Sequence, residues 1–201
     1  MLIKRISKND VKDLIPYHYL VEQSKGFRSG YNYGTYANNQ LQIACVFHSP
    51  SVPETVKGCF GFKRNEQKEV FELGRLIKNP KSDSNIILSQ FVALAIKQLR
   101  KDTNVKALIT YADSRYHFGY IYQALNFKYY GLTSKKSDFW FEQEDGSYVK
   151  HTRGKIVGKK GEWRTRPQKH RYLMIYDRNL KTKWNEERYP KGKNIEFKKD
   201  T

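Results

Sequence analysis

The chain has 201 residues, of which 38% are hydrophobic, enough for one globular domain with an extension but short for two full domains. No apolar run approaches the roughly 18 residues of a membrane span and no signal peptide opens the chain, so we expect a soluble protein of the cytoplasm. The 38 Lys and Arg residues against 20 Asp and Glu residues give a net charge of +18. This imbalance predicts a polyanionic partner, nucleic acid before membrane, whereas a merely basic soluble protein is the alternative.

The first part of the chain predicts a short strand over residues 1–7 and then a helix that Pro16 interrupts. Residues 24–36 combine Gly, Ser and aromatic residues, which is typical of a mobile loop with stacking faces, although packing between turns would give the same composition. Three strands are predicted next, over residues 40–47, 57–63 and 69–77. Gly74 in the third strand indicates a bulge or a close backbone approach.

The second part predicts a long amphipathic helix over residues 86–100, preceded by a polar loop that caps it. A buried strand, a polar turn, a short helix and a further strand follow over residues 105–132, and a hairpin follows over residues 138–149. The turn carries Asp113 and His117, and several tyrosines lie nearby. Polar groups at the end of an apolar strand are typical of a site in an α/β sheet. The order of elements predicts an α/β (α+β) fold with a mixed sheet flanked by helices.

Charge divides the chain at about residue 150. Residues 150–201 contain 17 Lys and Arg against six Asp and Glu, whereas residues 1–149 contain 21 against 14. Aromatic residues are interleaved with the basic ones, which suits phosphate neutralisation together with stacking on bases. We therefore predict a domain over residues 1–149 that carries the site and a basic extension over residues 150–201 that packs on the core and contacts nucleic acid. The residues predicted to bind the nucleic acid, which is DNA under the resemblance described next, are Arg164, Arg166, Lys169, His170 and Arg171.

Several segments together resemble the phage Mom family of DNA adenine hypermodification proteins, which have a GNAT-like acyltransferase fold with a mostly antiparallel central sheet. The matching segments are His18-Tyr19, Glu72-Leu73-Gly74-Arg75-Leu76, Tyr111-Ala112-Asp113, the run from His117 to Phe127, Lys169-His170-Arg171-Tyr172 and Tyr189-Pro190-Lys191. The resemblance implies transfer of a small acyl- or glycyl-derived group to N6 of adenine in DNA. The product would be a carbamoylmethyl-type adenine that protects phage DNA from host restriction.

Carried over by position, the resemblance implies that the catalytic residues are His18, Tyr19, Arg75, Asp113 and Tyr122. It also implies an iron ion, for which His18 and Asp113 are the predicted ligands, with His117 needed to complete a set of two histidines and one carboxylate. The turn over residues 114–118 is one residue shorter than the turn usual in the family. The spacing of Asp113 and Tyr122 depends on this turn.

The donor of the group is predicted less sharply. Relatives that use acyl-CoA have a glycine-rich loop at the start of the long helix, but residues 81–85 read Lys-Ser-Asp-Ser-Asn and contain no glycine. The donor-binding residues predicted there are Ser84, Asn85 and Ser89. The donor is acyl-CoA or another acyl or glycyl donor, such as a charged tRNA.

The expected mechanism must activate an amine whose lone pair is delocalised into the adenine ring. Arg75 would polarise the donor carbonyl, Asp113 or His18 would remove the amine proton, and Tyr122 would protonate the leaving group. A flipped base also needs aromatic walls. The candidates are Phe27, Tyr31, Tyr33, Tyr129 and Tyr130.

Two alternative functions stay open at this point: a non-catalytic nucleic-acid-binding protein with the same fold, and an acetyltransferase that acts on RNA or protein. The sequence also leaves the oligomeric state open.

Overall fold

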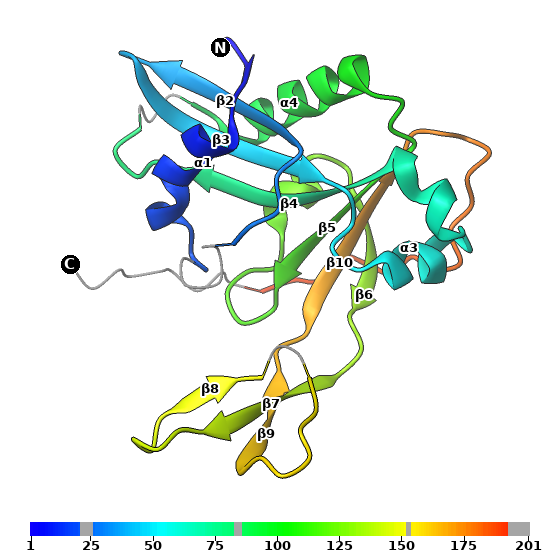
Figure 1. Cartoon of the computed structure of the whole chain (residues 1–201). Coiled ribbons are helices and arrows are strands. Elements are labelled where there is room, and N and C mark those ends of the chain that lie inside the picture. The colour runs from blue at the N-terminus through cyan, green and yellow to red at the C-terminus, as the bar shows by residue number, and fades with distance from the viewer. Residues whose placement is uncertain (21–25, 83–85, 152–153, 193–201) are drawn as a thin grey trace.

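A seven-stranded sheet in the order β1-β2-β3-β4-β5-β10-β6 forms the centre of the computed structural model, which describes residues 1–20, 26–82, 86–151 and 154–192 (Figure 1). All neighbouring strands are antiparallel except β4 and β5, which are parallel. The mixed, mostly antiparallel sheet agrees with the predicted fold class. Its strands are β1 (Lys4–Arg5), β2 (Tyr31–Ala37), β3 (Gln40–His48), β4 (Val70–Lys78), β5 (Ala107–Asp113), β6 (Lys128–Leu132) and β10 (Lys169–Ile175).

Helices cover both faces of this sheet. Helices α4 (Leu88–Asp102) and α5 (Tyr120–Ala124) pack on one face, and helices α1 (Lys8–Leu14) and α3 (Pro53–Phe60) pack on the other. Two 3-10 turns, Ile15–Tyr17 and Arg64–Glu69, complete the helical elements that the described residues form. Alternation along the strands separates the two cores, because neighbouring side chains point to opposite faces. In β3, for example, Cys45 packs with the α4 side and Val46 with the α1 side.

Two of the predicted elements are wrong. The strand predicted over residues 57–63 is the end of helix α3, which begins with Pro53 at its first turn and ends where Gly61 takes a φ of 80°. Val56, Cys59 and Phe60 are its buried residues, a helical spacing that the apparent strand pattern concealed.

The mobile loop predicted over residues 24–36 is also wrong over its second half, because residues 31–37 form strand β2. Tyr33 is fully buried there, and Gly34 lets Leu41 and Ile6 pack closely on the strand, since a Cβ atom would lie 2.7 Å from Leu41 Cδ1 and 2.9 Å from Ile6 Cδ1. Part of the predicted loop, residues 24 and 25, lies outside the described residues.

A second sheet, here called the arm, projects from the core (Figure 1). It contains β7 (Lys136–Glu142), β8 (Tyr148–Lys150) and β9 (Gly161–Arg166) in the order β8-β7-β9, and the predicted hairpin is its β7–β8 pair. The chain leaves the core after β6 to form the arm and returns as β10 between β5 and β6. The boundary predicted at residue 149 therefore falls within the arm, and the central sheet takes strands from both sides of it.

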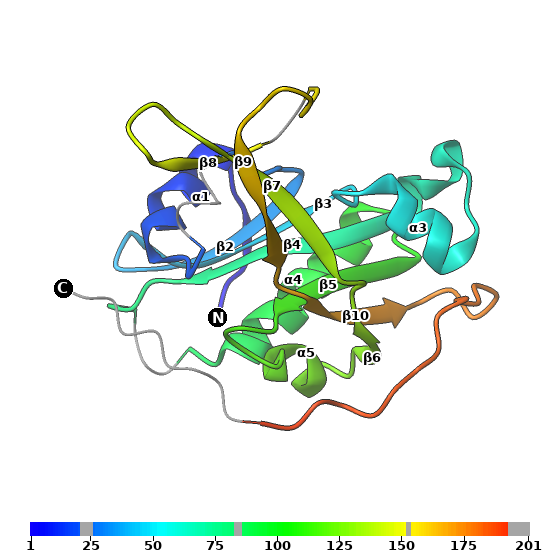
Figure 2. The ribbon, with the colours of Figure 1, turned by 90° about the horizontal axis from the view of Figure 1, so that it is seen from below.

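The segment after β10, residues 176–192, runs along the side of the core (Figure 2). The Lys183 N–H donates to the Cys59 carbonyl at 2.7 Å, the Glu187 N–H donates to the Tyr129 carbonyl at 2.9 Å, and the Tyr189 hydroxyl donates to the Phe127 carbonyl at 2.9 Å. These bonds hold the segment against α3 and β6. Within the described part of the chain, no helix combines the length and the apolar character that crossing a membrane requires.

Candidate active site

The site lies where the parallel strands β4 and β5 separate. They pair only from Val70 with Ala107 to Leu73 with Thr110, although β4 continues to Lys78 and β5 to Asp113. A bulge at Gly74 marks the divergence, because β3 pairs with Leu73 and Arg75 but skips the glycine. A Cβ atom at Gly74 would lie 2.0 Å from His48 Nε2, so the close approach predicted from this glycine is confirmed.

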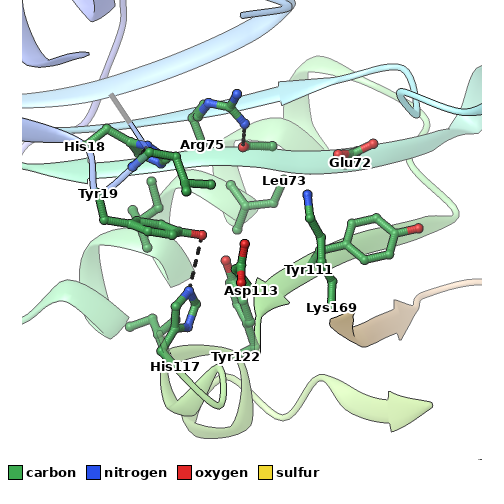
Figure 3. A pocket seen from close by; sticks show the side chains of 14 residues that line it. His18, Tyr19, Glu72, Leu73, Arg75, Tyr111, Asp113, His117, Tyr122 and Lys169 are labelled. Atoms are coloured by element: carbon green, nitrogen blue, oxygen red, sulfur yellow. Dashed lines mark hydrogen bonds between the residues drawn. The ribbon is translucent and has the colours of Figure 1, made fainter. Parts of the chain in front are cut away.

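The gap between the two strands holds a cavity of about 130 Å³, here called the first cavity (Figure 3). Its lining comes from both faces of the sheet: Tyr122 from α5 on one face, and Tyr111, which hydrogen-bonds Thr55 of α3, on the other. All five predicted catalytic residues line it. Their convergence is thus a fact of the structure, and their catalytic roles stay predictions. They are His18, Tyr19, Arg75, Asp113 and Tyr122.

The turn after Asp113 decides how that carboxylate is held. The N–H groups of Tyr116 and His117 donate to the Asp113 carbonyl at 3.0 and 3.1 Å, which closes a tight turn. The Arg115 guanidinium donates to both carboxylate oxygens of Asp113, at 3.1 Å from Nε and 3.0 Å from the terminal nitrogen. Asp113 is only 3% exposed. The shortened turn therefore keeps both Asp113 and Tyr122 in the cavity wall and fixes the carboxylate through Arg115.

Both histidines of the cavity are held as neutral hydrogen-bond donors. His18 Nδ1 accepts the Leu20 N–H at 3.1 Å, and His117 Nδ1 accepts the Gly119 N–H at 3.3 Å, so the ring proton of each neutral imidazole is on Nε2. His117 Nε2 lies 3.3 Å from the Tyr19 hydroxyl and donates to it. Burial, and then the positive charge of Arg75, lowers the pKa of His18 to about 4.

The remaining polar groups make the first cavity rich in donors. Burial raises the pKa values of Tyr19 and Tyr122, so both phenols keep their protons at neutral pH. Burial also lowers the pKa values of Arg75 and Lys169. Arg75 donates to the Gly74 carbonyl at 2.6 Å, and its buried Nε has no partner among the described residues. Such a cavity suits an oxygen that gains negative charge during a reaction.

The predicted iron ligands do not fit a metal site. His18 Nδ1 already accepts a backbone N–H, and Asp113 gives both carboxylate oxygens to Arg115. Arg75 and Lys169 add positive charge to the same walls. Across the described residues, no group of three or more His, Cys, Asp or Glu side chains is arranged to hold a metal ion. No step is therefore derived through a metal.

The predicted donor-binding residues are only partly described. Ser84 and Asn85 lie outside the described residues, and Ser89 lies in the first turn of α4 but lines neither of the cavities named in this structure. The first N–H groups of α4 have no partner within the helix, and its N-cap, Ile87, supplies no side-chain bond. Lys78 lies beside this end, where its Nζ donates to the Ile86 carbonyl at 3.3 Å. An anionic donor such as acyl-CoA would fit this end of the helix.

The predicted DNA-binding residues separate into groups. His170 is buried and its Nδ1 bonds the Tyr129 hydroxyl at 2.9 Å, so it has no surface for a phosphate and this prediction is wrong. Arg164 pairs with Glu162 on the exposed arm, and Arg166 pairs with Asp138 through two nitrogens. Lys169 lines the first cavity, and Arg171 lies over the Trp184 ring at 4.5 Å. Four of the five therefore stay candidates.

The aromatic residues predicted as candidate walls for a flipped base line neither of the two cavities of this structure. Phe27, Tyr33, Tyr129 and Tyr130 are each less than 7% exposed and belong to the hydrophobic cores, and Tyr31 packs on Phe71. The polar side chains that line the first cavity and were missed are those of Glu72 and Tyr111. Strand alternation would have found both, because Tyr111 shares a face with Asp113 two residues later, and Glu72 precedes the bulge glycine by two residues.

Solved structures with a similar fold are acetyltransferases. The ribosomal-protein-S18-alanine N-acetyltransferase from Escherichia coli is 9% identical with a TM-score of 0.50, and the match covers 89% of this chain and 97% of that chain. A probable acetyltransferase from Staphylococcus epidermidis is 10% identical with a TM-score of 0.50, covering 88% and 99%. At this identity the matches establish the GNAT acetyltransferase fold.

No curated protein matches the chain in sequence. The Mom protein family model matches residues 1–191, and the chain belongs to this family.

Proposed function

We propose that the protein transfers an acyl- or glycyl-derived group to N6 of adenine in DNA. Membership of the Mom family and the GNAT fold support acyl transfer. The observation that carries the proposal is the convergence of His18, Tyr19, Arg75, Asp113 and Tyr122 on one cavity at the separation of β4 and β5. The modified base would protect the DNA that carries it from restriction.

The chemical step forms a bond between N6 and the carbonyl carbon of the donor and breaks the bond between that carbon and the leaving group. One proton leaves N6, and the leaving group gains one. The N6 lone pair is delocalised, so the carbonyl must be polarised by donors that are already in place. Nε2–H of His18 and the guanidinium of Arg75 are such donors in the wall of the first cavity.

Proton transfer falls to two other residues of the cavity. Asp113 is the carboxylate among the predicted catalytic residues. Its Oδ1 accepts two Arg115 donors, whereas its Oδ2 accepts one and keeps a lone pair that can take the N6 proton while Arg115 fixes the orientation of the group. Tyr122 has a raised pKa because it is buried, so it arrives protonated and donates to the leaving group. His18 is neutral at pH 7 with its proton on Nε2, which favours the role of a hydrogen-bond donor over that of a base.

The donor supplies the activated group and is acyl-CoA or another acyl or glycyl donor. The first turn of α4 and Lys78 would hold its anionic part. The step described here bonds N6 to the carbonyl carbon and so gives an acyl adenine, for a glycyl donor the N6-glycyl amide. A carbamoylmethyl adenine is the isomer in which N6 is bonded to the CH2 carbon, so the two have equal mass and are distinguished by their fragmentation.

The test is nucleoside mass spectrometry of plasmid DNA from cells that express the full chain. We expect a deoxyadenosine of increased mass with the wild type and none with Asp113→Ala. Asp145→Ala is the matched control, because Asp145 lies in an exposed turn of the arm, where its carboxylate accepts hydrogen bonds from the backbone and the side chain of Ser147. Unmodified DNA in cells that contain folded wild-type protein contradicts the proposal and leaves a nucleic-acid-binding protein as the alternative.

A further inference from the structure

A second and larger cavity, of about 510 Å³, lies on the α3 face of the central sheet. Its floor is formed by Glu72 of β4, Tyr111 of β5 and Arg171 of β10. One wall is helix α3 with the residues just before it. The other is formed by the segments that connect the core to the arm and by the ends of the arm strands next to them, Lys136 of β7 and Arg166 of β9. Its volume lies within the roughly 300 to 1,000 Å³ typical of small-molecule sites.

The two cavities meet at four side chains. Glu72, Arg75, Tyr111 and Lys169 line both of them. A molecule in the second cavity therefore has one end against the walls of the proposed reaction site. The second cavity lies on one face of the sheet, and Tyr122 and helix α5 approach the first cavity from the opposite face. The gap between β4 and β5 thus joins the two faces of the sheet, so that the donor and the acceptor can reach it from opposite faces.

The lining has the chemistry that recognises a nucleotide. The second cavity is lined by five cationic side chains and two carboxylates. The carboxylates are those of Glu54 and Glu72, and the cations are Arg75, Lys136, Arg166, Lys169 and Arg171. Lys136 and Lys169 form no ion pair with any described residue, whereas Arg166 is paired with Asp138. The buried Nε atoms of Arg75 and Arg171 also have no partner among the described residues. A ligand with acceptor oxygens would use these donors.

Aromatic and acceptor groups complete this chemistry. Trp184 contributes an indole ring to the wall, and Arg171 lies 4.5 Å over that ring. Glu72 accepts the Ser51 N–H through Oε2 at 2.7 Å, which fixes its carboxylate at the junction of the cavities. A carboxylate accepts hydrogen bonds, and the exocyclic N6 amine of adenine donates them.

We propose that the second cavity is the acceptor pocket, which takes one unpaired adenine nucleotide of a DNA strand with its N6 amine at Glu72 and its phosphates at Lys136. This inference rests on the proposed function and names the site of its acceptor substrate. Adenine N6 is hydrogen-bonded within a duplex, so the base must leave the stack to enter such a pocket. The arm begins at Lys136, at the rim of the pocket, where it would lie along the strand that supplies the base.

Gly58 provides a way to fill the pocket without disturbing the core. It lies within α3, lines the second cavity, and its Cβ position has no atom within 4 Å. Gly58→Phe would place a ring in this open space, and Gly58→Ala is the matched control. A second, independent pair compares Lys136→Gln with Lys135→Gln. Lys135 is the exposed neighbour, carries the same charge and lines neither cavity.

The binding test uses the full chain and a single-stranded oligodeoxynucleotide in which 2-aminopurine, whose fluorescence depends on stacking, stands next to one adenine. The adenine keeps the N6 amine that 2-aminopurine lacks, and the fluorescence of its neighbour reports when it leaves the stack. We expect Gly58→Phe to weaken binding about tenfold or more, because stacking and burial of the base are lost. Lys136→Gln should weaken it about threefold or more through loss of a phosphate contact. Gly58→Ala and Lys135→Gln should bind like the wild type. If all four variants bind the oligodeoxynucleotide equally well, the second cavity is not the acceptor pocket.

DNA modification by the same variants separates this inference from the proposed function. If the wild type and Gly58→Phe modify DNA equally, the pocket is refuted and the transferase stands. If the wild type binds the strand in a manner that depends on Gly58 and Lys136 but modifies no DNA, the pocket stands and the proposed function fails. Tighter binding of the matching oligoribonucleotide than of the DNA strand would refute the assignment to DNA.

Discussion

Tyr122 combines two roles that a single substitution can separate. Its ring packs against Phe127 and Tyr172 in the core, and its hydroxyl reaches the first cavity beside Thr110. We expect Tyr122→Phe to lower the rate of transfer about a hundredfold, because the proposed general acid is lost and the ring is kept. The free energy of unfolding should fall by only about 1 kcal/mol, for one hydrogen bond.

The control for this prediction is Tyr129→Phe. The Tyr129 hydroxyl bonds buried His170 in the same core but does not line the first cavity. In this variant the free energy of unfolding should fall by a similar amount, and the transfer activity should be kept. Thermal unfolding measures the first quantity and nucleoside mass spectrometry measures the second. Equal activity of Tyr122→Phe and the wild type would show that the hydroxyl has no part in the reaction.

Gly74 fixes the bulge on which the site depends, and its substitution tests that role. A Cβ atom there would lie 2.0 Å from His48 Nε2, and His48 Nδ1 is itself bonded to the Ser49 carbonyl at 2.7 Å. We expect Gly74→Ala to reduce the free energy of unfolding by about 2 kcal/mol through overpacking. Gly58→Ala, which meets open space within a helix, should be neutral or stabilising. Urea unfolding of both variants measures the difference, and equal stability would contradict the close packing.

Sequence patterns located some of the individual residues of the site. The polar turn at the end of an apolar strand indicated Asp113, and the glycine in β4 indicated the bulge. His18 and Arg75 come from distant elements, so only the family resemblance connected them with Asp113. Arg115 was not predicted, because a surface arginine two residues from an aspartate has no distinctive spacing. Its role depends on the tight turn that directs the guanidinium back to the carboxylate.

Elements were predictable where their periodicity was long. Helix α4 has a buried residue at nearly every helical repeat, and β3 is buried almost throughout, so both were found. Helix α3 has only eight residues, and its last three, Gly-Cys-Phe, are followed by Gly-Phe, so that alternation over a few residues is compatible with a strand or a helix. Strand β2 was missed because its tyrosines and glycine have the composition of a loop, and only tertiary packing buries them.

Ion pairs at Asp138 hold the arm at its base. Asp138 pairs diagonally with Arg166 of β9, two residues beyond its register partner Arg164, and with Lys150 of β8. The Arg166 hydrogen bonds hold the pKa of the carboxyl at about 2, below its ordinary 3.8. Because the folded pKa is the lower one, this contribution is present above about pH 4 and is lost as the pH falls through about 2.

We therefore expect Asp138→Asn to speed amide hydrogen exchange in β7 and β9 at neutral pH about tenfold, for a loss of about 1 kcal/mol in local stability. Glu142→Gln breaks a single pair, with the exposed Lys160, and should change exchange much less. Exchange should remain unchanged in β4 and β5 of both variants. Equal exchange in the arm of both variants would show that Asp138 does not hold it.

For the whole molecule, the topology determines which deletions are informative. Residues 150–201, predicted as a basic extension that packs on the core, include β10, whose Tyr172 and Leu173 are buried on opposite faces of the central sheet. Deleting them would expose both cores, so a loss of DNA binding would report unfolding. The contribution of the basic charge must be tested by substitution within the intact fold.

The net charge of +18 predicts steep salt dependence of DNA binding, and the position of the arm predicts which charges matter. Lys155→Gln with Lys159→Gln removes two exposed charges beside the arm, and Lys97→Gln with Lys101→Gln removes two from α4 on the face opposite the second cavity. We expect the first pair to reduce the slope of log affinity against log salt by about one to two, because counterion release scales with phosphate contacts. The second pair should leave the slope unchanged. Fluorescence anisotropy with a labelled strand measures both slopes, and equal slopes would place the DNA on another surface.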